Sequence, residues 1–171
     1  LYTAIFTPSG DGACTISVAA NKYTDATGNN NVVSNTFNWT SDRTGPTMAI
    51  TAGEVSDGDS SQDTALSLTF TSSESTTNFA AEDISVTNGA LSDFAGSGTT
   101  YTATFTPTTE GACTINVNGS RFTDAYGNNN TAADEFNWVY DVTSPTMTIT
   151  STTSGVTDGS TTNDATIALT F

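Results

Sequence analysis

Carboxylates are the side chains with which this sequence could do chemistry. Eighteen Asp and Glu residues stand against three Lys and Arg residues, which gives a formal net charge of -15 at pH 7. Calcium takes about six to eight oxygen ligands from carboxylates and carbonyls, so acids placed beside Asn-rich turns favour this ion. We therefore expect calcium as a candidate cofactor and expect no other cofactor.

The acids form two groups of candidate calcium ligands, which the order of the expected strands places at two junctions between domains. The first group is expected where Asp11 and Asp42 face Glu74, Asp83 and Asp124 across one junction. The second group lies at the opposite pole and consists of Asp57, Asp59 and Asp141. No contiguous calcium-loop motif is present, and a solvated acidic surface without metal is the alternative.

Catalysis is not expected from these residues. Histidine, the most frequent general base, is missing, and the sequence has one lysine, Lys22. A Lys–Asn isopeptide cross-link would need a lysine in each core, but the residue equivalent to Lys22 in the second copy of the repeat described below is Arg121. Paired carboxylates could serve a glycosidase, but these acids are expected at domain poles without an enclosing cleft. We predict that the chain is not an enzyme.

The charge also excludes two classes of partner. Nucleic acids and anionic membrane surfaces are both bound through Lys and Arg, which are scarce here. No apolar run is long enough to cross a membrane, so direct membrane insertion is not expected.

Three Asn-x-Ser/Thr triplets are candidate glycosylation sites, at Asn38, Asn118 and Asn129. Asn38 should point outward if Phe37 and Trp39 point inward, and Asn129 is expected in a loop. Such triplets also arise by chance in a chain rich in Asn, Ser and Thr.

An internal repeat organises the chain. Residues 2–18 (YTAIFTPSGDGACTISV) return as residues 101–117 (YTATFTPTTEGACTINV), an offset of 99 residues. Residues 23–31 (YTDATGNNN) return as 122–130 (FTDAYGNNN) at the same offset. The chain is thus expected to begin and end within a domain. Residues 1–42 are the C-terminal half of one repeat, 43–142 are a complete repeat, and 143–171 are the first strands of the next.

Alternation of apolar and polar residues predicts seven strands in the complete repeat. They are expected near residues 47–51, 65–71, 83–87, 91–94, 100–106, 112–118 and 135–140. Seven short strands in about a hundred residues, with turn signals between them, are typical of an immunoglobulin-like β-sandwich. The predicted fold is therefore all-β, with tandem seven-stranded immunoglobulin-like sandwiches stacked end to end.

The inward face of the predicted strands follows from the same period of two. Its members are Met48, Ile50, Leu66, Leu68, Phe70, Ile84, Val86, Tyr101, Ala103, Phe105, Cys113, Ile115, Val117, Phe136 and Trp138. Cys113 is expected to be a small, reduced core residue, because one cysteine per repeat, Cys14 or Cys113, allows no bridge inside a domain.

The run NFAAEDISVTNGALSDFAGSGTTYTATFTPT, the loop FTDAYGNNN and the linker DVTSPTMTIT resemble bacterial-type immunoglobulin-like repeats of large extracellular adhesins and surface filaments. The resemblance covers nearly the whole chain. It implies an extracellular or cell-surface location, and calcium between domains is common in such adhesin repeats. The sequence departs from the usual pattern at Cys14 and Cys113, because these repeats are generally poor in cysteine.

Two functions remain open. The first is a structural segment of a fibre, stalk or surface appendage, whose short linkers 42–46 and 141–145 give length and stiffness. Its partners would be neighbouring repeats of the same chain and other copies in a fibre. The alternative is a ligand-binding adhesin module for calcium-dependent cell or sugar adhesion. The repeats are nearly identical, and most of their aromatic residues fall at positions that face the core. Both features favour the structural segment.

Overall fold

The computed structural model describes all residues from Leu1 to Phe171, and the chain divides into two units, Leu1–Asp141 and Val142–Phe171. Nearly all of its regular structure is β-strand, as predicted. One short 3-10 helix, η1 (Ala81–Asp83), interrupts the strands. No helix of the structure is long and apolar enough to cross a membrane.

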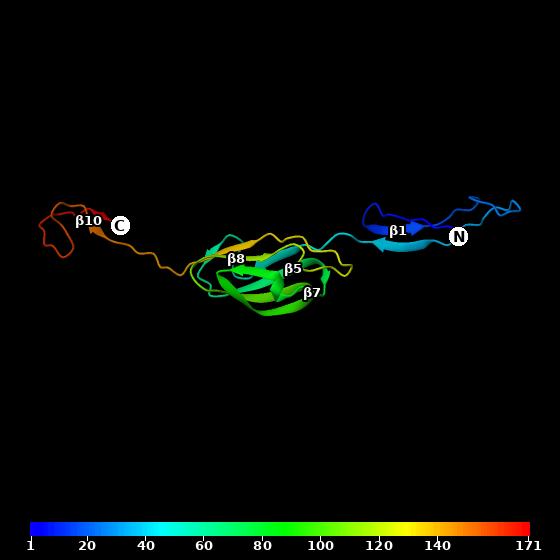
Figure 1. The fold of residues 1–171 in the computed structure, drawn as a ribbon. Coiled ribbons are helices and arrows are strands. Elements are labelled where there is room, and N and C mark those ends of the chain that lie inside the picture. The colour runs from blue at the N-terminus through cyan, green and yellow to red at the C-terminus, as the bar shows by residue number, and fades with distance from the viewer. The chain divides into compact units, whose positions relative to one another are not determined.

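Two sheets form a sandwich between residues 48 and 140 (Figure 1). The three-stranded sheet has the order β3-β5-β7, and the four-stranded sheet has the order β4-β9-β8-β6. The strands of the first sheet are antiparallel and are β3 (Met48–Ala52), β5 (Leu66–Thr76) and β7 (Gly89–Pro107). The strands of the second sheet are β4 (Ser60–Ser61), β6 (Ile84–Thr87), β8 (Gly111–Val117) and β9 (Phe136–Tyr140), of which only β4 pairs parallel to its neighbour.

The core lies between these sheets, because apolar residues alternate with polar ones along each strand. Every residue predicted to face inward is buried except Ile50 and Val86, which are half-buried. The prediction missed two buried aromatic residues, Phe79 and Phe122, which lie outside strands with clear alternation. Their rings contact each other edge to face, with centroids 5.0 Å apart.

The structure corrects three features of the predicted strands, and the first is the presence of β4, which was not predicted. The strand predicted at residues 65–71 continues to Thr76, and its register shifts between Thr71 and Thr76. The strands predicted at 91–94 and 100–106 form one element, β7, in which the expected turn at Gly96 and Gly98 is a bend with positive φ at both glycines. A Cβ on Gly89 would contact Phe105, so the two limbs of β7 lie alongside each other.

The residues before the sandwich form a separate hairpin. It pairs β1 (Gly12–Ile16) with β2 (Phe37–Ser41) in antiparallel fashion, and Cys14 lies opposite Trp39. Cys113 lies opposite Trp138 in the same way on β8 and β9. The repeat in sequence is therefore a repeat in strand register.

The second unit contains one small hairpin of β10 (Thr150–Ser151) and β11 (Leu169–Thr170). Thr150 pairs with Thr170, and Ser151 pairs with Leu169. These residues correspond in sequence to the β3–β5 pairs Thr51–Thr69 and Ala52–Leu68.

Candidate metal centre

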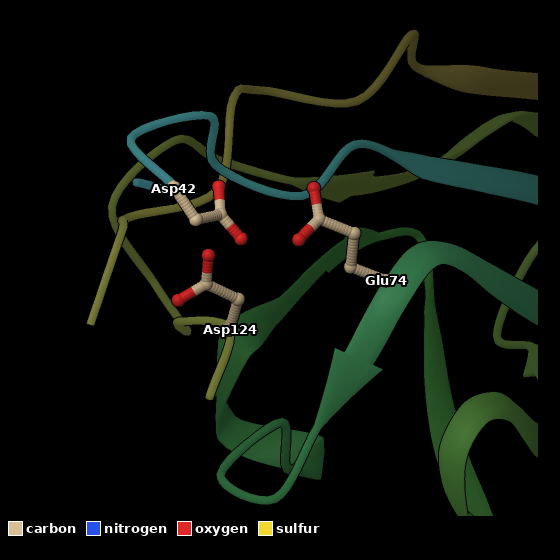
Figure 2. A group of neighbouring side chains, drawn as sticks. All are labelled: Asp42, Glu74 and Asp124. Atoms are coloured by element: carbon tan, nitrogen blue, oxygen red, sulfur yellow. The ribbon is translucent and has the colours of Figure 1, made fainter. Parts of the chain in front are cut away.

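Three carboxylates meet where the chain enters the sandwich. Asp42 follows directly after β2, Glu74 lies near the end of β5, and Asp124 lies in the loop between β8 and β9. One oxygen atom from each carboxylate lies within 4.8 Å of the other two. Figure 2 shows the three side chains pointing toward one another from three separate segments.

The loop that carries Asp124 is organised by that side chain. Its Oδ1 accepts hydrogen bonds from the backbone N–H groups of Tyr126 at 2.8 Å and Asn128 at 2.9 Å. Its Oδ2 accepts one from the Asn128 side-chain amide at 2.7 Å. In the first copy of the repeat, Asp25 accepts the equivalent bonds from Thr27 and Asn29. The Asp and Asn of the repeated DAxGN pattern therefore fix the turn that presents the carboxylate.

The electrostatics differ between the members of the cluster. Burial raises the pKa of Asp124, but the hydrogen bonds from Asn128, Tyr126 and Gly127 outweigh it and the net pKa is lowered. For Glu74, burial and then the charges of Asp42, Asp124 and Asp11 raise the pKa. The ionised form is thus disfavoured at Glu74, first by burial and then by the charges of its neighbours, and favoured at Asp124 by the hydrogen bonds.

Asp11 connects the preceding hairpin to the linker between β2 and β3. Its Oδ1 accepts the backbone N–H of Arg43 at 2.8 Å, and its Oδ2 accepts a short hydrogen bond from the Thr44 hydroxyl. The Arg43 guanidinium also lies 3.9 Å from the same carboxylate. These contacts hold the linker backbone at its N-terminal side.

The sandwich holds the linker at its other side. The Asn128 side chain donates to the carbonyl oxygen of Asp42 at 3.3 Å, and the N–H of Thr131 donates to the carbonyl oxygen of Pro46 at 3.0 Å. A Cβ on Gly45 would lie 1.9 Å from the carbonyl oxygen of Asn129, so a side chain has no room there. Asn128 and Gly45 were not predicted to hold the linker, although Asn128 repeats Asn29.

Asp83 was predicted to join the cluster but is not one of its members. Its Oδ2 accepts the backbone N–H of Ala80 at 2.9 Å, at the start of η1. Its role in the structure is therefore local, because its side chain stabilises the entry into the 3-10 helix.

The second predicted group does not form a three-carboxylate cluster. Asp57 accepts the backbone N–H of Asn137 at 2.6 Å, and Asp59 accepts that of Ser56 at 2.8 Å. The backbone N–H of Asp141 donates to the carbonyl oxygen of Ser61 at 3.0 Å. Asp57 and Asp59 thus stabilise the turn beside β9, and a metal-binding role for these three residues stays a prediction.

The donor set of Asp42, Glu74 and Asp124 fits calcium in its chemistry. Calcium ligands lie about 2.3–2.6 Å from the ion, so oxygens separated by up to about 5 Å can share one ion. Three carboxylates supply three to five of the required oxygens, because Oδ1 of Asp124 already accepts two hydrogen bonds, whereas its Oδ2 accepts one and keeps a second lone pair. Water and neighbouring carbonyls would complete the shell.

The three candidate glycosylation sites are all exposed. Asn38 lies in β2, Asn118 follows β8, and Asn129 lies in the loop after Asp124. Their modification stays a prediction.

One family model, described as bacterial Ig-like domain, matches residues 42–140. The match begins at Asp42 and ends at the last residue of β9, so it covers the whole sandwich. Comparison with curated proteins finds no match, and comparison with solved structures finds none either.

Proposed function

Because the chain belongs to the family of bacterial Ig-like domains, we propose that it is a structural repeat segment of an extracellular fibre, stalk or surface appendage. Domains of this family typically occur in surface proteins and are generally non-enzymatic modules. The segment provides length and stiffness, and its partners are neighbouring repeats of the same chain and other copies in a fibre.

The linker between β2 and β3 carries this proposal. A free linker would let the hairpin and the sandwich move independently, but this one is hydrogen-bonded by Asp11 on one side and by Asn128 and Thr131 on the other. Fixed contacts at both ends restrict the backbone dihedrals through which two neighbouring domains would bend. A module that serves as a spacer needs a linker whose backbone is restricted in this way.

Calcium is the second element of the proposal. Asp42 belongs to the linker, whereas Glu74 and Asp124 belong to the sandwich, so an ion bound by all three ties the linker to the sandwich. Without an ion the three charges repel one another, and a divalent cation reverses the sign of that interaction. Calcium therefore stiffens the joint that the hydrogen bonds have already shaped.

Backbone ¹⁵N relaxation on the whole chain tests the spacer function. We expect order parameters of about 0.8 or more for residues 42–47, close to those of β3 and β5. Asp11→Ala should lower the values at Arg43 and Thr44 toward about 0.6, the range of flexible backbone. Asp134→Ala removes the same charge at an exposed position and should leave them unchanged. Order parameters below about 0.6 across the linker of the unmodified chain would contradict a spacer.

Adhesion is the second candidate function, and Tyr126 favours it. This side chain is 75% exposed at the tip of the Asp124 loop, where an aromatic ring can stack on a sugar or a partner protein. The equivalent residue in the first copy is Thr27, so the ring is not required by the turn. A glycan array that shows binding by the chain, and loss of binding with Tyr126→Thr, would favour adhesion over a pure spacer.

A further inference from the structure

Two Asn-Gly pairs occur in the sandwich, Asn88-Gly89 and Asn118-Gly119. In such a pair the backbone nitrogen of the glycine can attack the side-chain amide carbon of the asparagine, because glycine has no Cβ that restricts its backbone or hinders the approach. Asparagine is accordingly one of the thermolabile residues of proteins. Both pairs carry the same chemistry in the sequence, and their surroundings in the structure distinguish them.

The amide of Asn88 is held in place. Its Nδ2 donates to the carbonyl oxygen of Thr109 at 2.8 Å, and its Oδ1 accepts from the N–H and the hydroxyl of Thr109 at 3.2 and 2.7 Å. A Cβ on Gly89 would lie 2.2 Å from the ring of Phe105, so the Gly89 backbone is packed against the core. Neither the amide carbon nor the attacking nitrogen of this pair is free to reorient.

The amide of Asn118 is free. Asn118 follows β8 and is exposed, and its side chain has no hydrogen-bond partner. The N–H of Gly119 has no partner either. A Cβ on Gly119 would meet nothing closer than the backbone nitrogen of Ala132 at 3.3 Å. Both reacting groups are therefore accessible to each other and to water.

We propose that Asn118 is a site of spontaneous deamidation in the folded chain and that the structure protects Asn88. The nitrogen of Gly119 forms a bond to Cγ of Asn118, and the bond from Cγ to Nδ2 breaks. Nδ2 leaves as ammonia with the proton that Gly119 gives up. Water then opens the cyclic imide at either of its two carbonyl carbons, which yields aspartate or isoaspartate.

The first copy of the repeat shows that the turn requires neither residue. Ala19 and Ala20 stand at the positions of Asn118 and Gly119. The Asn31 side chain donates to the carbonyl oxygen of Ala19 at 3.0 Å, as the equivalent Asn130 donates to that of Asn118 at 2.9 Å. Gly119→Ala therefore keeps the turn and blocks the reaction by hindering the attacking nitrogen.

The modified residue lies at one end of the Asp124 loop. Asn130 is 3% exposed and joins both ends of this loop. Its Oδ1 accepts the N–H groups of Arg121 and Phe122 at 2.7 and 3.0 Å, and its Nδ2 donates to the carbonyl oxygens of Asn118 and Thr131. In isoaspartate the main chain runs through Cγ, and the former carbonyl carbon becomes a carboxylate outside the main chain. The acceptor of the Asn130 amide thus loses its fixed position.

The same loop holds the linker. Asn128 donates to the carbonyl oxygen of Asp42, and the N–H of Thr131 donates to that of Pro46. Isoaspartate at Asn118 should therefore loosen the hold of the sandwich on the linker as the molecule ages. This consequence rests on the proposed spacer function, whereas the deamidation itself does not.

Peptide mapping of the whole chain tests the modification. The chain is produced without glycans, because a glycan on Nδ2 would change the leaving group, and is kept in mildly alkaline buffer. Chymotrypsin cleaves after Phe94 and Phe105 and so places Asn88 and Asn118 on different peptides. Tandem mass spectrometry then identifies the conversion of amide to acid and distinguishes isoaspartate from aspartate.

We expect conversion at Asn118 to both products, increasing with time, and none at Asn88. In urea both residues should convert, because the contacts that protect Asn88 are lost. Gly119→Ala should suppress the conversion of Asn118. Equal conversion of the two residues in the folded chain, or conversion of Asn118 in urea only, would overturn the proposal.

Backbone ¹⁵N relaxation on the isolated isoaspartate form tests the consequence. Order parameters of residues 42–47 and 128–131 should decrease toward about 0.6, the range of flexible backbone. Asn118→Asp adds the same charge with an ordinary main chain and should keep the values of the unmodified chain. Unchanged order parameters in the isoaspartate form would refute the effect on the linker. The spacer function is judged on the fresh chain, so the two failures are distinguishable.

Discussion

Cys113 and Trp138 face each other across β8 and β9, and Cys14 and Trp39 face each other across β1 and β2. In the sandwich the Trp138 ring also contacts Phe105 edge to face, with centroids 6.1 Å apart, and donates to Ser61. Trp138 therefore joins β9 to β4 and to β7. The two Cys–Trp pairs are an internal comparison, because the same pair occurs once inside a closed sandwich and once in an open hairpin.

Trp138→Ala should destabilise the sandwich by about 3–5 kcal/mol, through lost burial and the cavity that remains. Trp39→Ala is the matched control and should change the unfolding free energy by less than about 1 kcal/mol, because Trp39 is only half-buried in the two-stranded β1–β2 hairpin. Urea denaturation followed by circular dichroism measures both values. Similar losses for the two variants would contradict the assigned core.

Cys113 should be far less reactive than Cys14 toward a thiol reagent. Cys113 is fully buried, and burial raises the pKa of its thiol, whereas Cys14 is only half-buried. We expect one fast-reacting thiol in the native chain at pH 8 and a second only in urea, with Cys14→Ser removing the fast phase. A disulfide at Cys113 in a non-reducing mass spectrum would show this assignment to be wrong.

Millimolar calcium should raise the melting temperature of the chain, because an ion that binds only the folded state stabilises it by mass action. Asp42→Ala should largely remove the increase, since it deletes the linker's member of the cluster. Asp134→Ala should keep it. Calorimetry with calcium and with chelator measures the response, and equal melting temperatures in both would mean that the acids are a solvated surface.

Glu74→Gln should raise the melting temperature at pH 7 in chelator. Because the pKa of Glu74 is raised in the folded chain, the folded state holds this proton more tightly than the unfolded state. The contribution of Glu74 to stability is therefore present at pH values below its ordinary pKa and is lost as pH rises through the folded value. The gain of the variant should shrink between pH 7 and pH 4. Glu82→Gln, at an exposed position, should behave like the unmodified chain at both pH values.

Gly45→Ala should destabilise the chain by about 1–3 kcal/mol, because the new methyl group would collide with the backbone of Asn129. Gly53→Ala is the control, since its Cβ would meet nothing closer than 3.8 Å. We expect the control to change stability by no more than about 0.5 kcal/mol. Thermal unfolding of both variants checks this, and a harmless Gly45→Ala would mean that the linker is not held against the loop.

The strands and their buried faces followed from the sequence, because a period of two decides locally which side chains face the core. Leu66, Leu68 and Phe70 on β5 show this, since each was expected to face inward and each is buried. The internal repeat likewise agrees with the register that β1 and β2 share with β8 and β9. The family match agrees with the resemblance drawn from the DAxGN loop and the linker.

Tertiary structure decided which acids meet. Asp42, Glu74 and Asp124 come from a linker, a strand end and a loop that are far apart in the sequence, and no local pattern distinguishes them from Asp83 or Asp57. The extension of β5 to Thr76 brings Glu74 beside the Asp124 loop, and a bridge between Thr76 and Asp124 fixes that position. A strand pattern determines the direction of a side chain, but only the packing of distant segments determines what lies within reach of it.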